Sequence, residues 1–310
     1  MTRRGVVLGC GGTVGSAWQV GALAAVREQW DWDPRDAAVI VGTSGGASLA
    51  AMLGSGVGTD ELVAGQRGQA GARASVRRFF TEPPAAVPAV PALSGSWSLV
   101  QAGRRRRASL MTMTGLAPAG RTDPRFLDAL VDDLVQDGAW VAHPAVWVVA
   151  MDAKTGERTA FGSPGAPRVA MRDAVRASWA VPGWYPPVTI EGRKYLDGGV
   201  ASTGSVDLLV GQGLDEVLVV TPMASDKGVR VSGVGGRFES LMRVPMSRGL
   251  DREIAALEAD GVRVVRIYPS AAELAVMGPN FMNPRRRLPA MRTALANVPQ
   301  RLGAQLGGTQ

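Results

Sequence analysis

Residues 37–53 have the sequence AAVIVGTSGGASLAAML, in which two apolar runs flank a glycine-rich turn. The first run is typical of a buried strand and the second of a helix. Gly42, Ser44 and Gly46 give the turn the pattern Gly-x-Ser-x-Gly. This pattern can arise by chance in a chain with 40 glycines. A strand, tight turn and helix in this order nevertheless form a nucleophile elbow, where small neighbours leave room for a strained serine, so Ser44 is the candidate nucleophile.

The residues before this turn show the same alternation. Residues 6–8 form an apolar run, residues 9–15 are rich in glycine, and residues 16–29 have helical spacing. The order strand, loop, helix, strand, turn, helix predicts an α/β fold with a mostly parallel sheet flanked by helices. Functional sites of such folds lie at the carboxyl ends of the strands, where both glycine-rich segments fall.

The first glycine-rich segment, residues 9–15 (GCGGTVG), joins a strand to a helix. It departs from the dinucleotide-binding pattern Gly-x-Gly-x-x-Gly, because Val14 stands where the third glycine is needed. It also lacks the Gly-Lys-Ser/Thr of a P-loop. Small residues at a helix start expose backbone N–H groups that suit an oxyanion hole. We expect the oxyanion donors to be Gly11, Gly12 and Thr13, within a loop bounded by Gly9 and Gly15.

The base that activates the serine is the second requirement, and it is usually a histidine oriented by a carboxylate. The only histidine, His143, precedes a proline at the start of an expected strand, which argues against a Ser-His-Asp triad and for a capping or surface role. Asp197 is the better candidate base. It ends a short strand-like segment, and Gly198 and Gly199 after it permit an unusual turn close to a substrate. The alternative is a plain Asp-Gly turn.

These three motifs, in this order, resemble those of the patatin-like phospholipases. That family has a glycine-rich oxyanion loop, a Gly-x-Ser-x-Gly serine and an Asp-Gly-Gly or Asp-Gly-Ala aspartate. The likeness includes residues 177–183 (ASWAVPG) and covers most of residues 5–220. It implies a three-layer α/β/α fold and a lipid acyl hydrolase, either phospholipase-A-like or a general lipase or esterase. It further implies a Ser-Asp dyad of Ser44 and Asp197, with no metal and no cofactor.

One position departs from the family pattern. Many members have arginine or lysine just before the last glycine of the oxyanion loop, whereas this chain has Val14. The dyad would stay intact, with the oxyanion held by backbone N–H groups alone. Two alternatives therefore stay open: a soluble esterase or thioesterase for small acyl substrates, and a catalytically silent binding or regulatory protein.

The chain length of 310 residues fits a single domain, residues 1–310. Residues 65–120 lose clear periodicity and contain several prolines, which predicts a lid or cap insertion, with a poorly ordered insertion as the alternative. Residues 302–310 are expected to fray. Further helices are expected at residues 124–136, 171–178, 248–260 and 288–298, and further strands at residues 145–151, 193–196, 217–221 and 262–267.

The charge of the chain favours anionic partners. Its 34 basic residues exceed its 27 acidic ones, for a formal net charge of +7. No recognisable nucleic-acid motif is present, so a membrane surface is preferred over nucleic acid. The candidate contact is a basic run near Leu110, Met111 and Met113, formed by Arg104, Arg105, Arg106 and Arg107. A solvated charged loop is the alternative.

The single cysteine, Cys10, excludes an intramolecular disulfide and fits a reducing compartment. The apolar run at residues 5–8 is shorter than the roughly 7–15 residues of a signal-peptide core. No window approaches the roughly 18 apolar residues of a membrane-spanning helix. We therefore expect a cytoplasmic protein with at most peripheral membrane contact.

Overall fold

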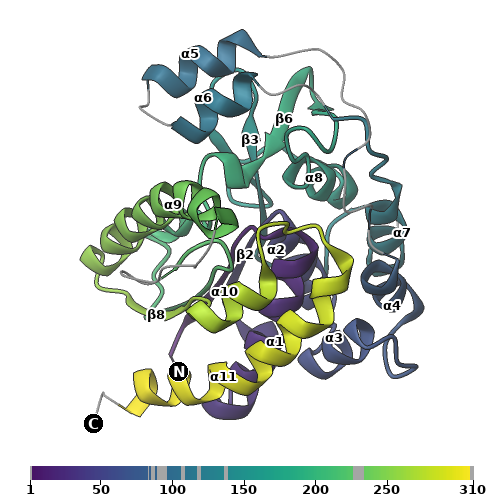
Figure 1. Cartoon of the computed structure of the whole chain (residues 1–310), viewed down its shortest axis with the longest axis vertical. Coiled ribbons are helices and arrows are strands. Elements are labelled where there is room, and N and C mark those ends of the chain that lie inside the picture. Colours follow the sequence, from purple (N-terminus) through teal and green to yellow (C-terminus); the bar gives the residue numbers. More distant parts are fainter. Residues whose placement is uncertain are drawn as a thin grey trace.

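A central sheet with helices on both faces forms the body of the protein (Figure 1). The computed structural model describes residues 2–82, 84, 88, 96–105, 109–116, 120–135, 139–225 and 234–307. The strands are β1 (Arg4–Leu8), β2 (Val39–Thr43), β3 (Val146–Asp152), β4 (Arg158–Phe161), β5 (Val188–Ile190), β6 (Arg193–Asp197), β7 (Glu216–Val220) and β8 (Arg263–Ile267). The α-helices are α1 (Gly12–Trp30), α2 (Gly45–Gly54), α3 (Thr59–Gln66), α4 (Ala74–Thr81), α5 (Trp97–Arg105), α6 (Ser109–Leu116), α7 (Arg125–Leu134), α8 (Met171–Ser178), α9 (Val234–Ala259), α10 (Ala271–Met277) and α11 (Arg287–Gly307).

The sheet is mostly parallel, which confirms the expected fold class. Strands β3, β2, β1, β7 and β8 lie side by side in this order and run parallel. Strands β4 and β6 pair antiparallel with β3, and β5 pairs antiparallel with β6. Because helices cover both faces, the central strands are almost entirely buried and consist of continuous apolar runs.

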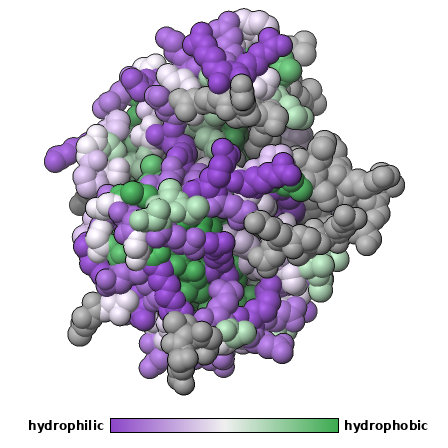
Figure 2. Space-filling view, turned by 90° about the vertical axis from the view of Figure 1, so that its left-hand side faces the viewer, coloured by the Kyte–Doolittle hydropathy of each residue, from purple (hydrophilic) through white to green (hydrophobic). Residues whose placement is uncertain are grey.

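Alternate residues of the strands enter two separate cores. On β1, Val6 and Leu8 face the larger core, which includes buried residues of α1, α2, α7, α8 and α11. Val7 faces the second core, which packs against α9 and a short 3-10 helix, η4 (Val206–Leu209). The sheet therefore lies between two layers of helices, with one core on each of its faces, which gives a three-layer fold. On the side of the molecule shown in Figure 2, hydrophilic residues dominate and hydrophobic residues gather near the centre.

Helices α5 and α6 lie over the end of the sheet formed by β3 and β6 (Figure 1). A third, smaller core joins them to the sheet, and it includes Leu99, Met111, Met151 and Leu196. Met111 was expected beside a membrane surface, but it is buried here and holds α6 against the sheet. Arg104 and Arg105 are exposed at the end of α5, whereas Arg106, Arg107 and the side chain of Leu110 lie outside the described residues.

The expected insertion at residues 65–120 is too long, because α4 belongs to the main core. Val76, Phe79 and Phe80 are buried there at a spacing that places them on one face of a helix. Phe79 also stacks on Phe126 of α7 and meets the edge of Trp179. The part of this region that lies outside the main core is therefore α5 and α6. Helix α7 buries its apolar stripe in the core, as expected.

The expected frayed end is also wrong over most of its length. Helix α11 continues to Gly307, and Leu302 is buried in the main core. The side chain of Gln305 accepts a hydrogen bond from the backbone N–H of Arg266 at 3.3 Å and donates one to its carbonyl at 2.9 Å. Residues 308–310 lie outside the described residues. Helix α9 likewise begins at Val234, well before the expected start at Arg248.

Within the described ranges, none of the helices has both the length and the apolar character that a transmembrane span requires.

Candidate active site

One edge of β3 brings the Gly-x-Ser-x-Gly turn and the Asp-Gly-Gly segment together. Strand β2 pairs with β3 as far as Thr43 and Val149, and β6 pairs with β3 from Asp197 and Ala150 onward. Strand β4 pairs with an overlapping part of β3 and so occupies its other edge. Strands β2 and β6 therefore meet end to end along the same edge. Ser44, which follows Thr43, comes to lie next to Asp197.

Ser44 lies in a strained backbone conformation between β2 and α2. Its φ of 56° and ψ of −123° lie in a region that residues other than glycine rarely adopt. The backbone N–H of Ser44 donates a hydrogen bond to the hydroxyl of Ser178 at 2.8 Å. That hydroxyl donates in turn to the carbonyl of Val149 at 2.6 Å. Ser178 thus ties the turn to β3, a role that the sequence alone did not reveal.

The glycines around Ser44 allow α2 to begin directly against neighbouring backbone. A Cβ at Gly46 would collide with the carbonyl oxygen of Leu8, and a Cβ at Gly42 would lie 2.5 Å from the carbonyl oxygen of Gly46. An added Cβ would come within 3.0 Å of another atom at each of the six expected motif glycines, Gly9, Gly15, Gly42, Gly46, Gly198 and Gly199. All six glycines therefore lie where the chain is too crowded for a side chain.

Asp197 is buried, with 4% of its surface exposed, and its carboxylate faces Ser44. It accepts hydrogen bonds from the Ser44 hydroxyl and from the backbone N–H of Gly199, the latter at 2.7 Å. Burial raises the pKa of Asp197 to about 7, because the charged form loses hydration, while the two hydrogen bonds oppose this rise. Such a carboxylate can exchange a proton near neutral pH.

The glycine-rich loop lies against the start of α2, where a Cβ at Gly45 would be 2.6 Å from the carbonyl oxygen of Gly12. Its second half is the first turn of α1, which starts at Gly12 rather than at the expected Ser16. Within the described chain, the backbone N–H groups of Gly11, Gly12 and Thr13 have no hydrogen-bond acceptor. Gly11 and Gly12 line a cavity together with Ser44 and Asp197. Thr13 is buried beside it, with its hydroxyl 3.3 Å from the carbonyl oxygen of Phe281, to which it donates.

Val14, the position that departs from the family pattern, does not face this cavity. Its side chain is buried in the main core. Its backbone N–H donates to the carbonyl of Phe281 at 3.0 Å. The backbone of Val14 therefore ties the first turn of α1 to the segment after α10, while its side chain packs in the core.

The cavity has a volume of about 410 Å³ and a mainly apolar wall. Its residues come from the glycine-rich loop, the segments that carry Ser44 and Asp197, the segments after α8, β7 and α10, and helices α6 and α9. The apolar side chains among them are Val181, Pro182, Trp184, Val200, Met223, Met246, Pro279 and Phe281. Val181 and Pro182 lie in the segment 177–183 that the family resemblance includes, whereas the other apolar residues come from distant segments and no sequence motif marks them.

Two further polar residues, Cys10 and Arg243, lie near Asp197 or near each other. Cys10 lines the cavity, and burial together with the negative charge of Asp197 raises the pKa of its thiol, which therefore stays neutral. Arg243 of α9 is buried and donates a hydrogen bond to the carbonyl of Pro222 at 2.7 Å. Its positive charge acts in the opposite direction on Cys10, so a cation lies near the site.

His143 lies at the entrance to β3 and holds backbone rather than a nucleophile. Its Nε2 is 2.7 Å from the carbonyl oxygen of Ala37, and its Nδ1 accepts a hydrogen bond from the N–H of Ala145 at 3.1 Å. It is not among the residues that line the cavity. This is the capping role expected for His143.

Comparison with known proteins agrees with the motifs. A family model described as patatin-like phospholipase matches residues 6–210. The chain is similar to the crystal structure of VipD from Legionella pneumophila, at 15% identity and a TM-score of 0.46, over 98% of this chain and 67% of that one. It is also similar to the type III effector protein ExoU, at 15% identity and a TM-score of 0.38, over 97% of this chain and 53% of that one. No curated protein sequence matches the chain.

The family match covers more than half of the chain and includes the glycine-rich loop, Ser44 and Asp197. The chain therefore belongs to the patatin-like phospholipase family, whose members are lipid acyl hydrolases.

Proposed function

We propose that this chain cleaves fatty-acyl esters through a covalent intermediate on Ser44, with Asp197 as the base. One observation carries the proposal. Ser44, on a strained turn, donates a hydrogen bond to a buried carboxylate whose pKa is raised to about 7, and both residues line an apolar cavity. A nucleophile and a base within hydrogen-bond reach are what acyl transfer requires.

In the first half-reaction, Asp197 takes the proton of the Ser44 hydroxyl while Oγ attacks the ester carbonyl carbon. The carbonyl π electrons move to the oxygen, which becomes the oxyanion of a tetrahedral intermediate. When the intermediate collapses, the bond between the carbonyl carbon and the alcohol oxygen breaks. The proton on Asp197 passes to that oxygen, so the alcohol leaves and an acyl-serine remains.

In the second half-reaction, water repeats the attack. Asp197 takes one proton from water as the water oxygen bonds to the acyl carbon. The bond to Ser44 Oγ then breaks, and the proton returns from Asp197 to the serine. The fatty acid leaves, and both residues are restored.

The backbone N–H groups of Gly11 and Gly12 are the best placed oxyanion donors, because they lack an acceptor in the described chain and line the cavity. They lie where the chain enters α1, so the helix dipole adds to their effect. The N–H of Thr13 is also without an acceptor, but this residue lies behind the cavity wall. We therefore rank Thr13 below the two glycines.

The apolar wall favours an acyl chain as the bound group, over a small polar acyl substrate. Val181, Met223, Met246 and Phe281 come from four separate segments and enclose the space next to Ser44. Burial of methylene groups against them gives about 0.8 kcal/mol each. We expect turnover to rise with acyl length until the cavity is filled.

We also propose that α5 and α6 form a cap that contacts an anionic membrane from the outside. Three large apolar residues are exposed on these helices, Trp97 (65%), Met113 (61%) and Leu116 (66%). Arg104 and Arg105 are exposed at the end of α5. Apolar insertion and attraction of basic residues to anionic lipid act together in peripheral binding.

Hydrolysis of p-nitrophenyl esters of increasing acyl length tests the assignment. We expect Ser44→Ala to abolish turnover, because it removes the nucleophile. We expect Asp197→Asn to lower turnover by about 10³-fold or more, because it removes the base on which that nucleophile depends. Ser163→Ala changes a serine in the turn after β4 that does not line this cavity, and it should keep wild-type rates.

Three outcomes would contradict this proposal. Persisting turnover in the Ser44 variant would exclude this nucleophile. A preference for the shortest esters would favour a small-substrate esterase. Absence of turnover and of covalent labelling in the wild-type chain would favour a silent homologue.

A further inference from the structure

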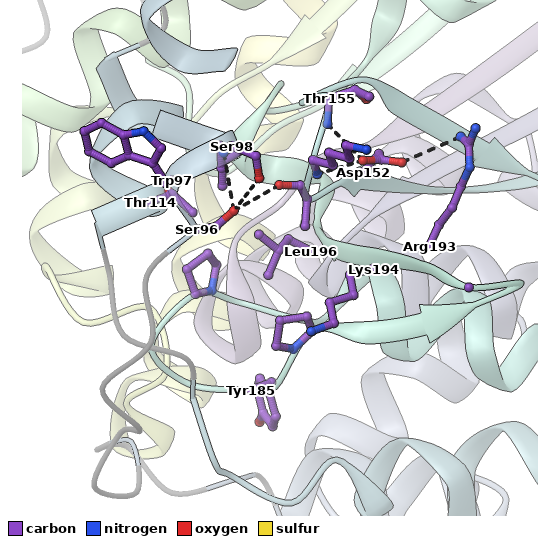
Figure 3. Close-up of a pocket in the computed structure, with 16 residues that line it drawn as sticks. Ser96, Trp97, Ser98, Thr114, Asp152, Thr155, Tyr185, Arg193, Lys194 and Leu196 are labelled. Carbon is purple, nitrogen blue, oxygen red and sulfur yellow. Dashed lines mark hydrogen bonds and ion pairs between the residues drawn. The ribbon is translucent and has the colours of Figure 1, made fainter. Parts of the chain in front are cut away.

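A second cavity adjoins the candidate active site. Its volume is about 940 Å³, and it lies between the start of α5, the turn after β3 and the hairpin of β5 and β6. In Figure 3, Ser96 and Trp97 lie on one side of this cavity, and Asp152 and Arg193 lie on the other. Thr114 and Pro182 line both this cavity and the one that contains Ser44. The two cavities therefore meet at these two residues.

The second cavity holds an unusual concentration of lysine. The chain has 34 basic residues, of which only three are lysines, and two of these, Lys154 and Lys194, line this cavity. Arg193 lines it as well and is paired with Asp152 at 3.6 Å. Across the described ranges, neither lysine has an ion-pair partner. The cavity lining thus includes two lysines that have no ion-pair partner among the described residues.

The carboxylate of Asp152 does not neutralise these lysines. Besides its pairing with Arg193, it accepts hydrogen bonds from the backbone N–H groups of Lys154 and Thr155, at 2.7 and 2.9 Å. Asp152 is buried, and its hydrogen bonds to the two backbone N–H groups stabilise the turn after β3. An anion that enters the cavity would meet the free ammonium groups rather than this carboxylate.

The backbone places both lysines at a short distance from the dyad. The N–H of Ala153 donates to the carbonyl of Lys194 at 2.8 Å, so the segments that carry the two lysines lie side by side. Strand β6 then leads from Lys194 to Asp197, three residues or about 10 Å further along an extended chain. A glycerophospholipid has a similar separation between its two reacting and charged groups, because several covalent bonds lie between the phosphate and each ester carbonyl. One lipid could therefore place its phosphate near the lysines and an ester near Ser44.

We propose that this second cavity binds the phosphate-bearing head group of a lipid, and that Lys154 and Lys194 make the enzyme selective for lipids whose head group has a net negative charge. The inference rests on the proposed function, since the ester must be at Ser44 while the phosphate is at the lysines. A choline head group would bring a second cation to Lys154, Lys194 and Arg193 and would be disfavoured by repulsion. An acidic head group carries no such cation and would not be repelled.

Short-chain lipids that dissolve as monomers test this without a membrane. The full-length chain is assayed on dihexanoyl phosphatidic acid, dihexanoyl phosphatidylcholine and dihexanoylglycerol. We expect the Lys154→Gln, Lys194→Gln double variant to lose about 10- to 100-fold in kcat/KM on phosphatidic acid, because charge-assisted hydrogen bonds to phosphate are among the stronger contacts. Its rate on dihexanoylglycerol should stay within about twofold of wild type, because this neutral lipid makes no such contact.

Two matched variants serve as controls. Arg78→Gln with Arg252→Gln also removes two positive charges, but from exposed positions on α4 and α9. This double variant should keep the wild-type ratio of activity on phosphatidic acid to activity on phosphatidylcholine. Lys154→Arg with Lys194→Arg keeps both charges and should retain activity on phosphatidic acid. Added inorganic phosphate should leave the hydrolysis of dihexanoylglycerol unchanged, because a free anion does not position the ester.

The outcomes separate this inference from the proposed function. An equal loss on phosphatidic acid and dihexanoylglycerol, or no loss on phosphatidic acid, would overturn the head-group site while Ser44-dependent hydrolysis stands. Hydrolysis of either lipid by Ser44→Ala would instead overturn the proposed function.

Discussion

Asp197 combines two properties that usually exclude each other, because it is buried and yet has to be ionised to act as a base. Burial raises its pKa, whereas the hydrogen bonds from Ser44 and from the N–H of Gly199 lower it. The balance is a pKa of about 7. A carboxylate in this range is a stronger base than an exposed aspartate and is still ionised in part at neutral pH.

This balance predicts the pH dependence of the reaction. Below the pKa, Asp197 is protonated in the free enzyme and cannot accept the serine proton, so kcat/KM should rise with pH and level off above about pH 7. Initial rates on a soluble neutral ester across the pH range measure it, with Ser44→Ala as the blank for spontaneous hydrolysis. An acid limb near pH 4, the ordinary range of an aspartate, would contradict the role given to burial.

At the same scale, the sequence pointed to the proposed nucleophile and the proposed base, which the structure brings together, but not to the residues around them. Ser44 and Asp197 stand in short motifs, and the presence of a single histidine excluded the usual partner. Ser178 and Arg243 reach the site from α8 and α9. No local pattern marks either residue, because its role depends on how distant segments pack.

The turn between β2 and α2 is the element on which the site depends. Gly46 lies against the carbonyl oxygen of Leu8 at the end of β1, so a methyl group there would push α2 away from the sheet. We expect Gly46→Ala to lower the free energy of unfolding by about 2–4 kcal/mol, in the range of overpacked or strained positions. Denaturant unfolding of the purified variant measures this loss, and residual hydrolysis shows whether Ser44 is displaced.

Gly249→Ala is the control for that substitution. Gly249 lies in α9 with no atom near an added Cβ, so alanine should be neutral or should stabilise the helix by up to about 1 kcal/mol. If Gly46→Ala unfolds at the same denaturant concentration as wild type, the close packing of α2 on β1 does not constrain the turn.

Helices and strands with a strong periodic pattern could be predicted, whereas elements that depend on tertiary contacts could not. Helix α7 and strands β3 and β7 lie close to their expected positions. Helix α4 was assigned to the lid because its neighbours are rich in arginine, glycine and proline, although Phe79 and Phe80 pack in the main core. Leu302 and Gln305 hold the last turns of α11 in place. The glycines near the chain end predict fraying, and no local pattern indicates these tertiary contacts.

On the scale of the whole molecule, α5 and α6 lie beside both cavities and present exposed apolar residues outward. Thr114 of α6 lines the two cavities, whereas Met113 and Leu116 on the same helix are exposed. A cap in this position would approach a membrane with its outer face while its inner face borders the path to Ser44. The proposed membrane contact and the proposed head-group site then lie on the same side of the molecule.

Sedimentation with phosphatidylglycerol vesicles tests the membrane contact. We expect Met113→Ser with Leu116→Ser to weaken vesicle binding by about tenfold or more, because two exposed apolar side chains no longer insert. Hydrolysis of a soluble ester should be unaffected. Val210→Ser with Val244→Ser removes two exposed apolar residues elsewhere and should bind like wild type. Equal binding of both double variants would show that α5 and α6 do not dock on lipid.

Covalent labelling with a fluorophosphonate probe shows whether Asp197 activates Ser44. Mass spectrometry of the labelled chain identifies the modified residue, and the labelling rate at several pH values reports the base. We predict a single adduct on Ser44, a rate that rises with pH around an apparent pKa of about 7, and a loss of labelling in Asp197→Asn. An adduct on another residue, or labelling of Asp197→Asn at the wild-type rate, would contradict the account.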